Sequence, residues 1–245
     1  MMPLNMEKNF TWLRAFLLIP LLVLASAAAD ATDSRYTSVR ASPDGIGKVY
    51  MGREIAKVMS YSGAYWLERP ERKEEEKPER VLAELELKPG MIVADVGAGS
   101  GYYSSRMAER VGSNGTVYAL DIQPEMIDIL RLQMSQRRVT NVKPILCTET
   151  NPRLPAGTLD LALMVDVYHE FEYPYEMLAA VVKALKPGGR VVFVEFRGDD
   201  PTVPIKALHT MTEAQVRKEA AVQPLEWVKT VGDLPWQRVI VFRKP

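Results

Sequence analysis

The middle and the end of the chain alternate short apolar runs with amphipathic segments. The runs predict strands at 91–96, 116–121, 142–147, 159–166 and 190–196, and two closing strands at 225–230 and 237–243. The segments between them predict helices at 103–111, 124–137, 175–185 and 211–221. Apolar strands joined by helices indicate a parallel sheet that is covered on both faces. The pattern therefore predicts an α/β fold.

The residues before this alternation follow other patterns. Residues 32–50 are polar and predict a loose arm, whereas Ile55, Val58 and Met59 have helical spacing within 51–67. The charged run 68–77 is expected to be solvated, and a short helix is expected at 79–87. We therefore expect an N-terminal arm and helical lid over 30–78 and the α/β domain over 79–245.

The first 29 residues have the three parts of a secretory signal. Lys8 and Arg14 precede an uncharged run over 15–29, and small residues follow at 25–31. The run is shorter than the roughly 20 residues that a membrane span needs. We expect cleavage after Ala29 or Ala31 and export to the periplasm. An uncleaved anchor, which would be the only membrane contact, remains the alternative.

Composition excludes several classes of function. The 31 Lys and Arg residues balance the 31 Asp and Glu residues, so no global basic field favours nucleic acid. The chain has one cysteine, Cys147, which rules out an intramolecular disulfide. With His169 and His209 as the two histidines, soft ligands are few, and we expect no metal site.

A glycine-rich turn follows the first strand of the α/β region. Gly97, Gly99 and Gly101 let the backbone approach a ligand closely. Tyr102 stands where a dinucleotide fingerprint has its third glycine, and it would crowd a pyrophosphate. Asp95 adds a carboxylate that repels phosphate and suits a cation.

Asp121 ends the second strand, 20 residues after Gly101. An acidic residue at this place can accept hydrogen bonds from both ribose hydroxyls of an adenosine. Together with Asp95, it indicates an adenosine that carries positive charge and no phosphate. That description fits S-adenosylmethionine, whose sulfonium and amino group favour carboxylates and aromatic rings.

Residues about 80–196 resemble the class I S-adenosylmethionine-dependent methyltransferases. Residues 93–102 are similar to motif I, 118–121 to the following acidic motif, 159–166 to motif IV and 185–194 to the segment entering strand five. The resemblance implies a Rossmann-like sheet of seven mostly parallel strands with an antiparallel last strand. Beyond the signal, the chain also resembles predicted exported bacterial methyltransferases.

The resemblance also implies roles for particular residues. Asp121 would hold the ribose, Ile122 would lie against the adenine, and Glu149 falls where the family caps the adenine amino group. Asp166 and His169 would flank the methyl group and the acceptor. The residues expected around the methionine moiety are Asp95, Gly97, Ala98, Gly99, Gly101 and Tyr102.

The acceptor is expected to bind at the end of the strand predicted over 159–166. His169 has an intrinsic pKa suited to a general base, and Asp166 and Glu170 could orient it, although each could equally be a structural loop residue. Residues 53–72 are expected to close over the cofactor. Further candidates for the pocket are Tyr61, Trp66, Arg69, Tyr103, Tyr168, Glu195, Arg197 (for an anionic acceptor) and His209.

The residues at the end of the strand predicted over 159–166 restrict the class of molecule that can accept the methyl group. Residues 166–169 lack the two prolines with which amino-methylating enzymes of DNA and RNA stack a flipped base. The turn 99–102 is also similar to that of protein isoaspartate carboxyl methyltransferases. We expect a small-molecule acceptor; a protein carboxyl acceptor, or a non-catalytic S-adenosylmethionine-binding protein, remains open.

The Asp121→Ala substitution is expected to weaken S-adenosylmethionine binding, because it removes the acceptor of the ribose hydrogen bonds. Calorimetric titration of the intact chain and the variant measures this. An intact chain that gives no heat would favour the non-catalytic alternative.

Overall fold

The computed structural model describes residues 35–245. The predicted signal over 1–29 lies outside the described residues. Within 35–245, none of the helices combines the length and the apolar character that crossing a membrane requires.

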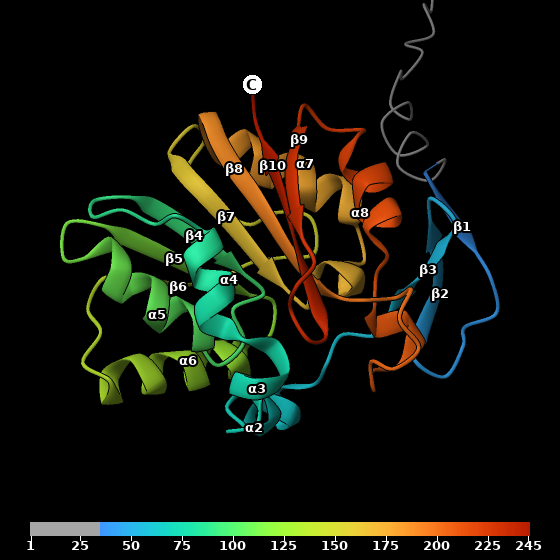
Figure 1. Cartoon of the computed structure of the whole chain (residues 1–245), viewed down its shortest axis with the longest axis horizontal. Helices are drawn as coiled ribbons and strands as arrows, with labels where there is room; N and C mark the ends of the chain where they lie inside the picture. The colour runs from blue at the N-terminus through green and yellow to red at the C-terminus, as the bar shows by residue number, and fades with distance from the viewer. Residues whose placement is uncertain (1–34) are drawn as a thin grey trace, which may run out of the picture. The chain divides into compact units, whose positions relative to one another are not determined.

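A seven-stranded sheet forms the centre of residues 35–245, with the strand order β6-β5-β4-β7-β8-β10-β9 (Figure 1). Neighbouring strands from β6 to β8 pair in parallel, and β10 runs antiparallel to both β8 and β9. This confirms the predicted sheet with its antiparallel last strand. The strands are β4 (Ile92–Val96), β5 (Thr116–Asp121), β6 (Val142–Leu146), β7 (Leu159–Val165), β8 (Leu185–Phe196), β9 (Glu226–Val231) and β10 (Gln237–Arg243).

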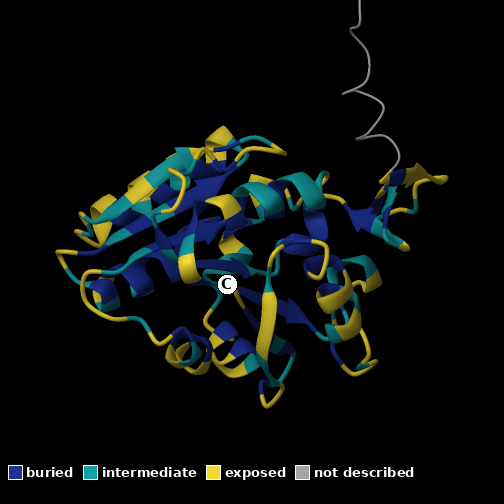
Figure 2. Ribbon diagram, turned by 90° about the horizontal axis from the view of Figure 1, so that it is seen from above, coloured by how far each residue is buried: buried dark blue, intermediate teal, exposed yellow. Residues whose placement is uncertain are grey.

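Successive residues of a strand point to opposite faces of the sheet, so an apolar run makes both faces apolar. Helices therefore cover both faces. In β8, Val191 and Phe193 pack in one core cluster while Val192 and Val194 pack in another. The first cluster contains α7 (Pro174–Ala184) and α8 (Glu213–Ala220); the second contains α4 (Pro78–Glu84) and α5 (Tyr102–Val111). A smaller cluster includes α6 (Pro124–Gln136). Figure 2 shows the buried strands between helices with exposed outer faces.

The strand order reverses beside β4, which pairs with β5 on one side and with β7 on the other. The chain leaves β4 and β7 toward opposite edges of the sheet, so a crevice opens at their carboxyl ends. Open α/β sheets bind their ligands at such a crevice. The predicted motifs at 97–101, 121 and 166–170 all lie at this edge.

The expectation of a loose arm over 32–50 is wrong. Residues 36–56 form an antiparallel sheet of β1 (Tyr36–Ser38), β2 (Gly45–Tyr50) and β3 (Arg53–Ala56). Tyr36, Tyr50 and Ile55 are buried together on it, and Gly52, with φ of 96°, supplies a turn.

The helix expected over 51–67 is present only at its end. It is confined to the 3₁₀ turn η1 (Tyr61–Gly63) and to α2 (Ala64–Leu67). The charged run is not simply solvated, because in α3 (Arg72–Glu76) the terminal residues are both buried and paired at 2.6 Å. The proposed domain boundary between residues 78 and 79 stays a prediction.

The N-terminal sheet is attached through a buried ion pair. Arg53 on β3 donates from Nε and from a terminal nitrogen to Glu219 on α8, at 2.6 and 3.1 Å. Its other terminal nitrogen donates to the carbonyl of His169 at 3.0 Å, in the 3₁₀ turn η2 (Tyr168–Glu170). Glu219 is fully buried. One guanidinium therefore joins the N-terminal sheet, α8 and η2.

The Glu219→Gln substitution is expected to lower the free energy of unfolding by about 3–5 kcal/mol, because it leaves the Arg53 charge buried without a counter-ion. Urea unfolding measures this change. The same substitution at Glu226, which pairs with Arg243 on the exposed edge, is the control and should cost at most about 1 kcal/mol. Equal losses for the two variants would contradict this interpretation.

Candidate active site

A cavity of about 570 Å³ lies at the carboxyl ends of the strands, within the range of roughly 300–1,000 Å³ that is typical of small-molecule sites. Its walls come from the ends of β4, β5, β7 and β8, from residues 57–72 and from residues 204–209. The predicted site residues that line it are Trp66, Gly97, Gly99, Asp121, Ile122, Glu149, Asp166, His169, Glu170 and His209.

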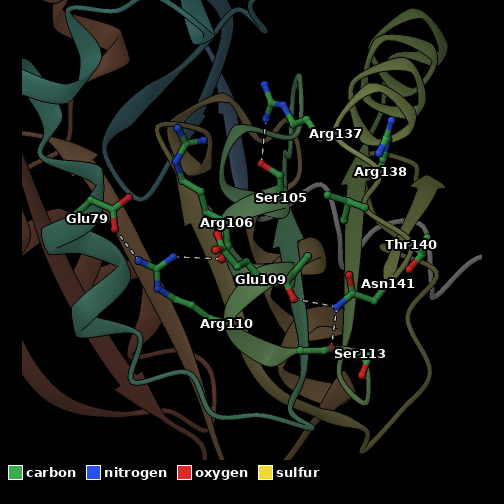
Figure 3. Close-up of a pocket in the computed structure, with 13 residues that line it drawn as sticks. Glu79, Ser105, Arg106, Glu109, Arg110, Ser113, Arg137, Arg138, Thr140 and Asn141 are labelled. Carbon is green, nitrogen blue, oxygen red and sulfur yellow. Dashed lines mark hydrogen bonds and ion pairs between the residues drawn. The ribbon is translucent and has the colours of Figure 1, made fainter.

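A larger cavity of about 940 Å³ lies away from these strand ends, beside the far end of α5 and the loop before β6 (Figure 3). Several arginines line it, but three are engaged: Arg110 pairs with Glu79, Arg137 donates to Ser105 and Arg106 donates to the Tyr102 carbonyl. Among the described residues that line it there is no member of the glycine turn and no strand-end carboxylate. The cavity at the strand ends is therefore the candidate site.

The glycine turn gives backbone access that side chains would block. Gly97 and Gly99 have φ of 74° and 54°, in the left-handed region. A Cβ atom on Gly97 would lie 2.3 Å from Val167, and one on Gly99 would lie 2.5 Å from Leu67. Both positions therefore favour glycine through their backbone conformation, and at Gly97 the β-branched Val167 also leaves no room for a side chain.

Asp121 presents a carboxylate at one end of the cavity. Its oxygens accept hydrogen bonds from the backbone N–H groups of Gly99, at 3.2 Å, and Gln123, at 2.9 Å. Burial raises the pKa of Asp121, although these hydrogen bonds oppose the shift. Ile122 and Met126 provide apolar surface beside it. A carboxylate beside apolar walls fits the ribose and the base of an adenosine.

The charge of the lining favours a cation over a phosphate. Of the described residues around this cavity, six are acidic and three are Lys or Arg. The acidic residues are Asp44, Asp121, Glu149, Asp166, Glu170 and Glu172. The sulfonium and amino group of S-adenosylmethionine fit this surplus of carboxyl groups.

Asp95 does not line this cavity, contrary to its expected contact with the methionine moiety. It is buried and accepts a hydrogen bond from the Ser104 hydroxyl on α5 at 2.6 Å. Burial raises the pKa of Asp95 to about 6; the Ser104 hydrogen bond and the Arg72 charge oppose the shift, and Asp121 adds to it.

Three further predicted contacts of the glycine turn, Ala98, Gly101 and Tyr102, are also absent from the lining of this cavity. Tyr102 packs in the core beneath Arg72 and Arg106, whose guanidinium carbons lie 4.3 and 3.6 Å from the ring centre. A Cβ atom on Gly101 would lie 2.9 Å from Met134 of α6. These residues pack the turn against its helices.

Asp166 occupies a strained position at the end of β7. Its φ is 50°, which is uncommon for a residue with a side chain. One carboxyl oxygen accepts from the Gln237 amide at 2.6 Å, while Oδ1 is buried without a hydrogen-bond partner among the described residues. Burial, together with Glu76 and Glu195, raises the pKa of Asp166 well above its ordinary value. Strain and an unpaired polar atom at one residue indicate a functional position.

Glu195, at the end of β8, holds η2 in place. One of its oxygens accepts from the backbone N–H of Tyr168 at 3.1 Å, and the other lies 2.6 Å from Nδ1 of His169. Burial alone would lower the pKa of His169, but the Glu195 carboxylate outweighs it and raises the pKa. Glu195 therefore orients His169, whereas the sequence had offered Asp166 and Glu170 as the residues that could orient it.

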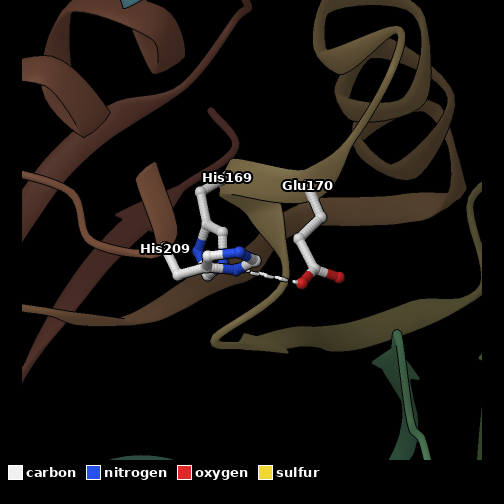
Figure 4. A group of neighbouring side chains, drawn as sticks. All are labelled: His169, Glu170 and His209. Carbon is white, nitrogen blue, oxygen red and sulfur yellow. Dashed lines mark ion pairs between the residues drawn. The ribbon is translucent and has the colours of Figure 1, made fainter. Parts of the chain in front are cut away.

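Glu170 and His209 complete a cluster with His169 (Figure 4). Oε1 of Glu170 lies 3.3 Å from Nδ1 of His209 and 3.9 Å from Nε2 of His169. The three residues come from η2 and from η3 (Ala207–His209), and all of them line the cavity. The expectation of no metal site counted soft ligands alone and does not account for this cluster.

The segment 57–72 forms one wall of the cavity, while the expected closure of residues 53–72 over the cofactor stays a prediction. Gln123 donates to the Met59 carbonyl at 3.0 Å and accepts from the Tyr61 N–H at 2.9 Å. The Met59 N–H donates to Glu170 at 3.2 Å. Gln123 was not predicted, although its place two residues after Asp121 could have indicated it. Leu67 and Arg72 also line the cavity; they belong to the predicted segment 53–72 but were not named individually.

Several further candidates lie elsewhere. Arg197 pairs with Asp200 at 3.0 Å and donates to the Pro235 carbonyl, and Arg69 pairs with Glu75 and Glu76. The tyrosines 103 and 168 are buried in the core, and Tyr61 is exposed. None of these described residues lines the cavity.

Comparison with known proteins finds that this chain is similar to methyltransferases. Residues 93–189 match a family model described as a methyltransferase domain. An aklanonic acid methyltransferase of a Streptomyces species is 31% identical over 159 residues, which cover 59% of this chain and 71% of that protein. A protein-L-isoaspartate O-methyltransferase of Methanothrix thermoacetophila is 34% identical over 118 residues, covering 44% of this chain and 49% of that protein.

Apart from the Streptomyces protein, the chain spans about half the length of the curated relatives it matches. Among solved structures, an S-adenosylmethionine-dependent methyltransferase from Aquifex aeolicus has a TM-score of 0.73 at 26% identity. That match covers 77% of this chain and all of the other.

Asp95 is expected to make stability depend on pH. Its folded pKa of about 6 exceeds the ordinary 3.8, so the folded state holds the proton more tightly. Its contribution is fully present below pH 3.8 and is lost as the pH rises to about 6, a change of about 3 kcal/mol. Asp95→Asn lacks this dependence, so wild type should lose stability relative to this variant over that range.

Urea unfolding at pH 4 and pH 7 measures the effect. Asp128→Asn, on the exposed surface of α6, is the control and should follow wild type at both pH values. A difference between wild type and Asp95→Asn that stays constant with pH would contradict the prediction.

Proposed function

We propose that this chain, which belongs to the class I S-adenosylmethionine-dependent methyltransferases, transfers a methyl group to a small-molecule acceptor in the cavity at its strand ends. The observation that carries the proposal is that the two ends of the cavity carry different kinds of side chain. Asp121 and apolar side chains lie at the end of β5, and His169, Glu170 and His209 gather near the end of β7. The position proposed for the cofactor and the position proposed for the acceptor therefore lie in the same cavity.

At the cofactor end, Asp121 would accept the ribose hydroxyls, and Ile122 and Met126 would flank the adenine. The backbone at Gly97 and Gly99 would lie along the methionine moiety. S-adenosylmethionine supplies a methyl group on a positively charged sulfur, and the carboxyl groups of the lining favour that charge. Glu149, which lines the same cavity, would accept from the adenine amino group.

At the acceptor end, the chain has to align a nucleophile with the methyl carbon and the sulfur. Alignment alone can supply several kcal/mol of the barrier. Glu195 and Arg53 hold η2 from two sides, so His169 is held in one orientation. Where the acceptor must lose a proton, the imidazole of His169 or His209 would accept it.

The size of the acceptor is inferred from the wall that residues 57–72 add to the cavity. The hydrogen bonds of Met59 to Glu170 and Gln123 hold this wall over both ends. A small molecule fits beneath such a cover more readily than a protein segment does. The similarity to isoaspartate methyltransferases keeps a protein carboxyl group as the second candidate.

We also propose export, on the strength of the charged start, the apolar run and the small residues that end at Ala31. This proposal rests on the sequence alone.

Labelled S-adenosylmethionine, incubated with the chain and either a small-molecule extract or an isoaspartyl peptide, tests the acceptor class. Label is expected in a small molecule. Label in the peptide alone would replace the proposal with the protein alternative.

The Gly97→Ala substitution tests whether methyl transfer depends on this cavity. The new Cβ atom meets Val167, so cofactor affinity and methyl transfer should fall more than tenfold. Gly90→Ala is the matched control: its φ is also positive, but a Cβ atom there has no heavy atom of the described chain within 4 Å, so binding should persist. Equal effects of the two variants would show that methyl transfer does not depend on this cavity.

A further inference from the structure

We propose that His169, Glu170 and His209 bind a divalent first-row transition-metal ion at the acceptor end of the cavity. Each residue offers one ligand atom, and these atoms lie within 4.8 Å of one another. Metal–ligand bonds of about 2.0–2.2 Å separate neighbouring ligands by roughly 3.0–3.5 Å. The separations of Glu170 Oε1 from the two rings, 3.3 and 3.9 Å, are close to that spacing.

The orientation of His169 suits a metal ligand. Its Nδ1 lies 2.6 Å from the Glu195 carboxylate, so the hydrogen there is donated to Glu195 and the lone pair remains on Nε2. Nε2 is the nitrogen that faces Glu170. Metal-binding histidines regularly donate their second nitrogen to a carboxylate in this way, which fixes the tautomer and raises the basicity of the ligand.

The surroundings of Glu170 suit a metal better than an ordinary ion pair. Its carboxylate is buried to about nine-tenths, and Oε1 is directed at both imidazole rings while accepting from the Met59 N–H. The rings meet edge to face, with centres 5.3 Å apart, and come from separate segments of the chain. A cation among the three groups would compensate the buried carboxylate without protonating both rings.

The ligand types indicate the kind of ion and its coordination. Two imidazoles and one carboxylate favour Fe²⁺, Mn²⁺, Co²⁺ or Zn²⁺ over Mg²⁺ and Ca²⁺, which prefer oxygen ligands. Three protein ligands leave coordination positions open, as in catalytic and not in structural sites. The open positions would face the cavity, because all three residues line it.

An ion at this place would bind an acceptor through a hydroxyl or enol oxygen, a role that rests on the proposed function. Coordination lowers the pKa of such a hydroxyl, and its proton passes to solvent, because the bound ion occupies the lone pairs of both imidazoles and replaces them as the means of deprotonation. The oxygen–carbon bond to the methyl group then forms while the carbon–sulfur bond breaks. The electron pair of the broken bond stays on sulfur and leaves a neutral thioether. The acceptor class is therefore an oxygen nucleophile.

Titration of the chelator-treated full chain with Co²⁺ tests the site. We expect one ion per chain, visible d–d absorption bands and a dissociation constant in the micromolar range or below. His209→Ala, which truncates the last residue of η3, should weaken Co²⁺ binding at least tenfold, and so should Glu170→Gln. Glu226→Gln, which alters an exposed acidic residue outside the cavity, is the control and should bind Co²⁺ as wild type does.

The absence of bands at millimolar Co²⁺, or unchanged affinity in His209→Ala, would overturn the proposal. Titration of the same samples with S-adenosylmethionine keeps the two proposals distinguishable. Cofactor binding without Co²⁺ binding overturns the metal site alone, and Co²⁺ binding without cofactor binding overturns the proposed function while the metal site stands.

Discussion

The buried carboxylate of Glu195 is the interaction on which the geometry of this molecule depends most. A carboxylate removed from water costs several kcal/mol unless hydrogen bonds replace its hydration. Both oxygens of Glu195 are engaged, one by the backbone of Tyr168 and one by the ring of His169. Because Glu195 is the next-to-last residue of β8 and η2 follows the neighbouring strand β7, these two bonds fix where the chain goes after β7.

This anchoring explains how the strained backbone at Asp166 persists. A left-handed conformation at a residue with a side chain survives only where its surroundings determine it from several directions. Gln237 holds the Asp166 side chain, and Glu195 holds the turn that follows. Arg53 adds a third constraint from the N-terminal sheet by binding the His169 carbonyl. The N-terminal sheet is thus a structural part of the site, although it lies outside the sheet that supplies the strand ends.

The parts that the sequence predicted correctly are those set by local pattern. Apolar runs such as 159–166 and 190–196 have a period and length that leave few alternatives to buried strands, and Asp121 and His169 reach the cavity because strand ends determine their place. The orientation of Asp95 depends on Ser104 in the next helix, and the approach of His209 to Glu170 depends on a contact across 39 residues. Residues 36–56 were misjudged because Arg53, which attaches their sheet, finds its partner 166 residues away.

The wall formed by residues 57–72 is tied to the cavity at two places, through Gln123 at the adenosine end and through Glu170 at the other. Its bonds to Gln123 and Glu170 lie close together at Met59 and Tyr61, whereas Glu68 holds the later part of the segment through Ser100 and Arg137. One displacement of this segment would uncover both ends together, so spent nucleoside and methylated product would depart through a shared exit. Each turnover would then require those bonds to break, a step that limits the rate in many enzymes whose site is covered by a segment of the chain.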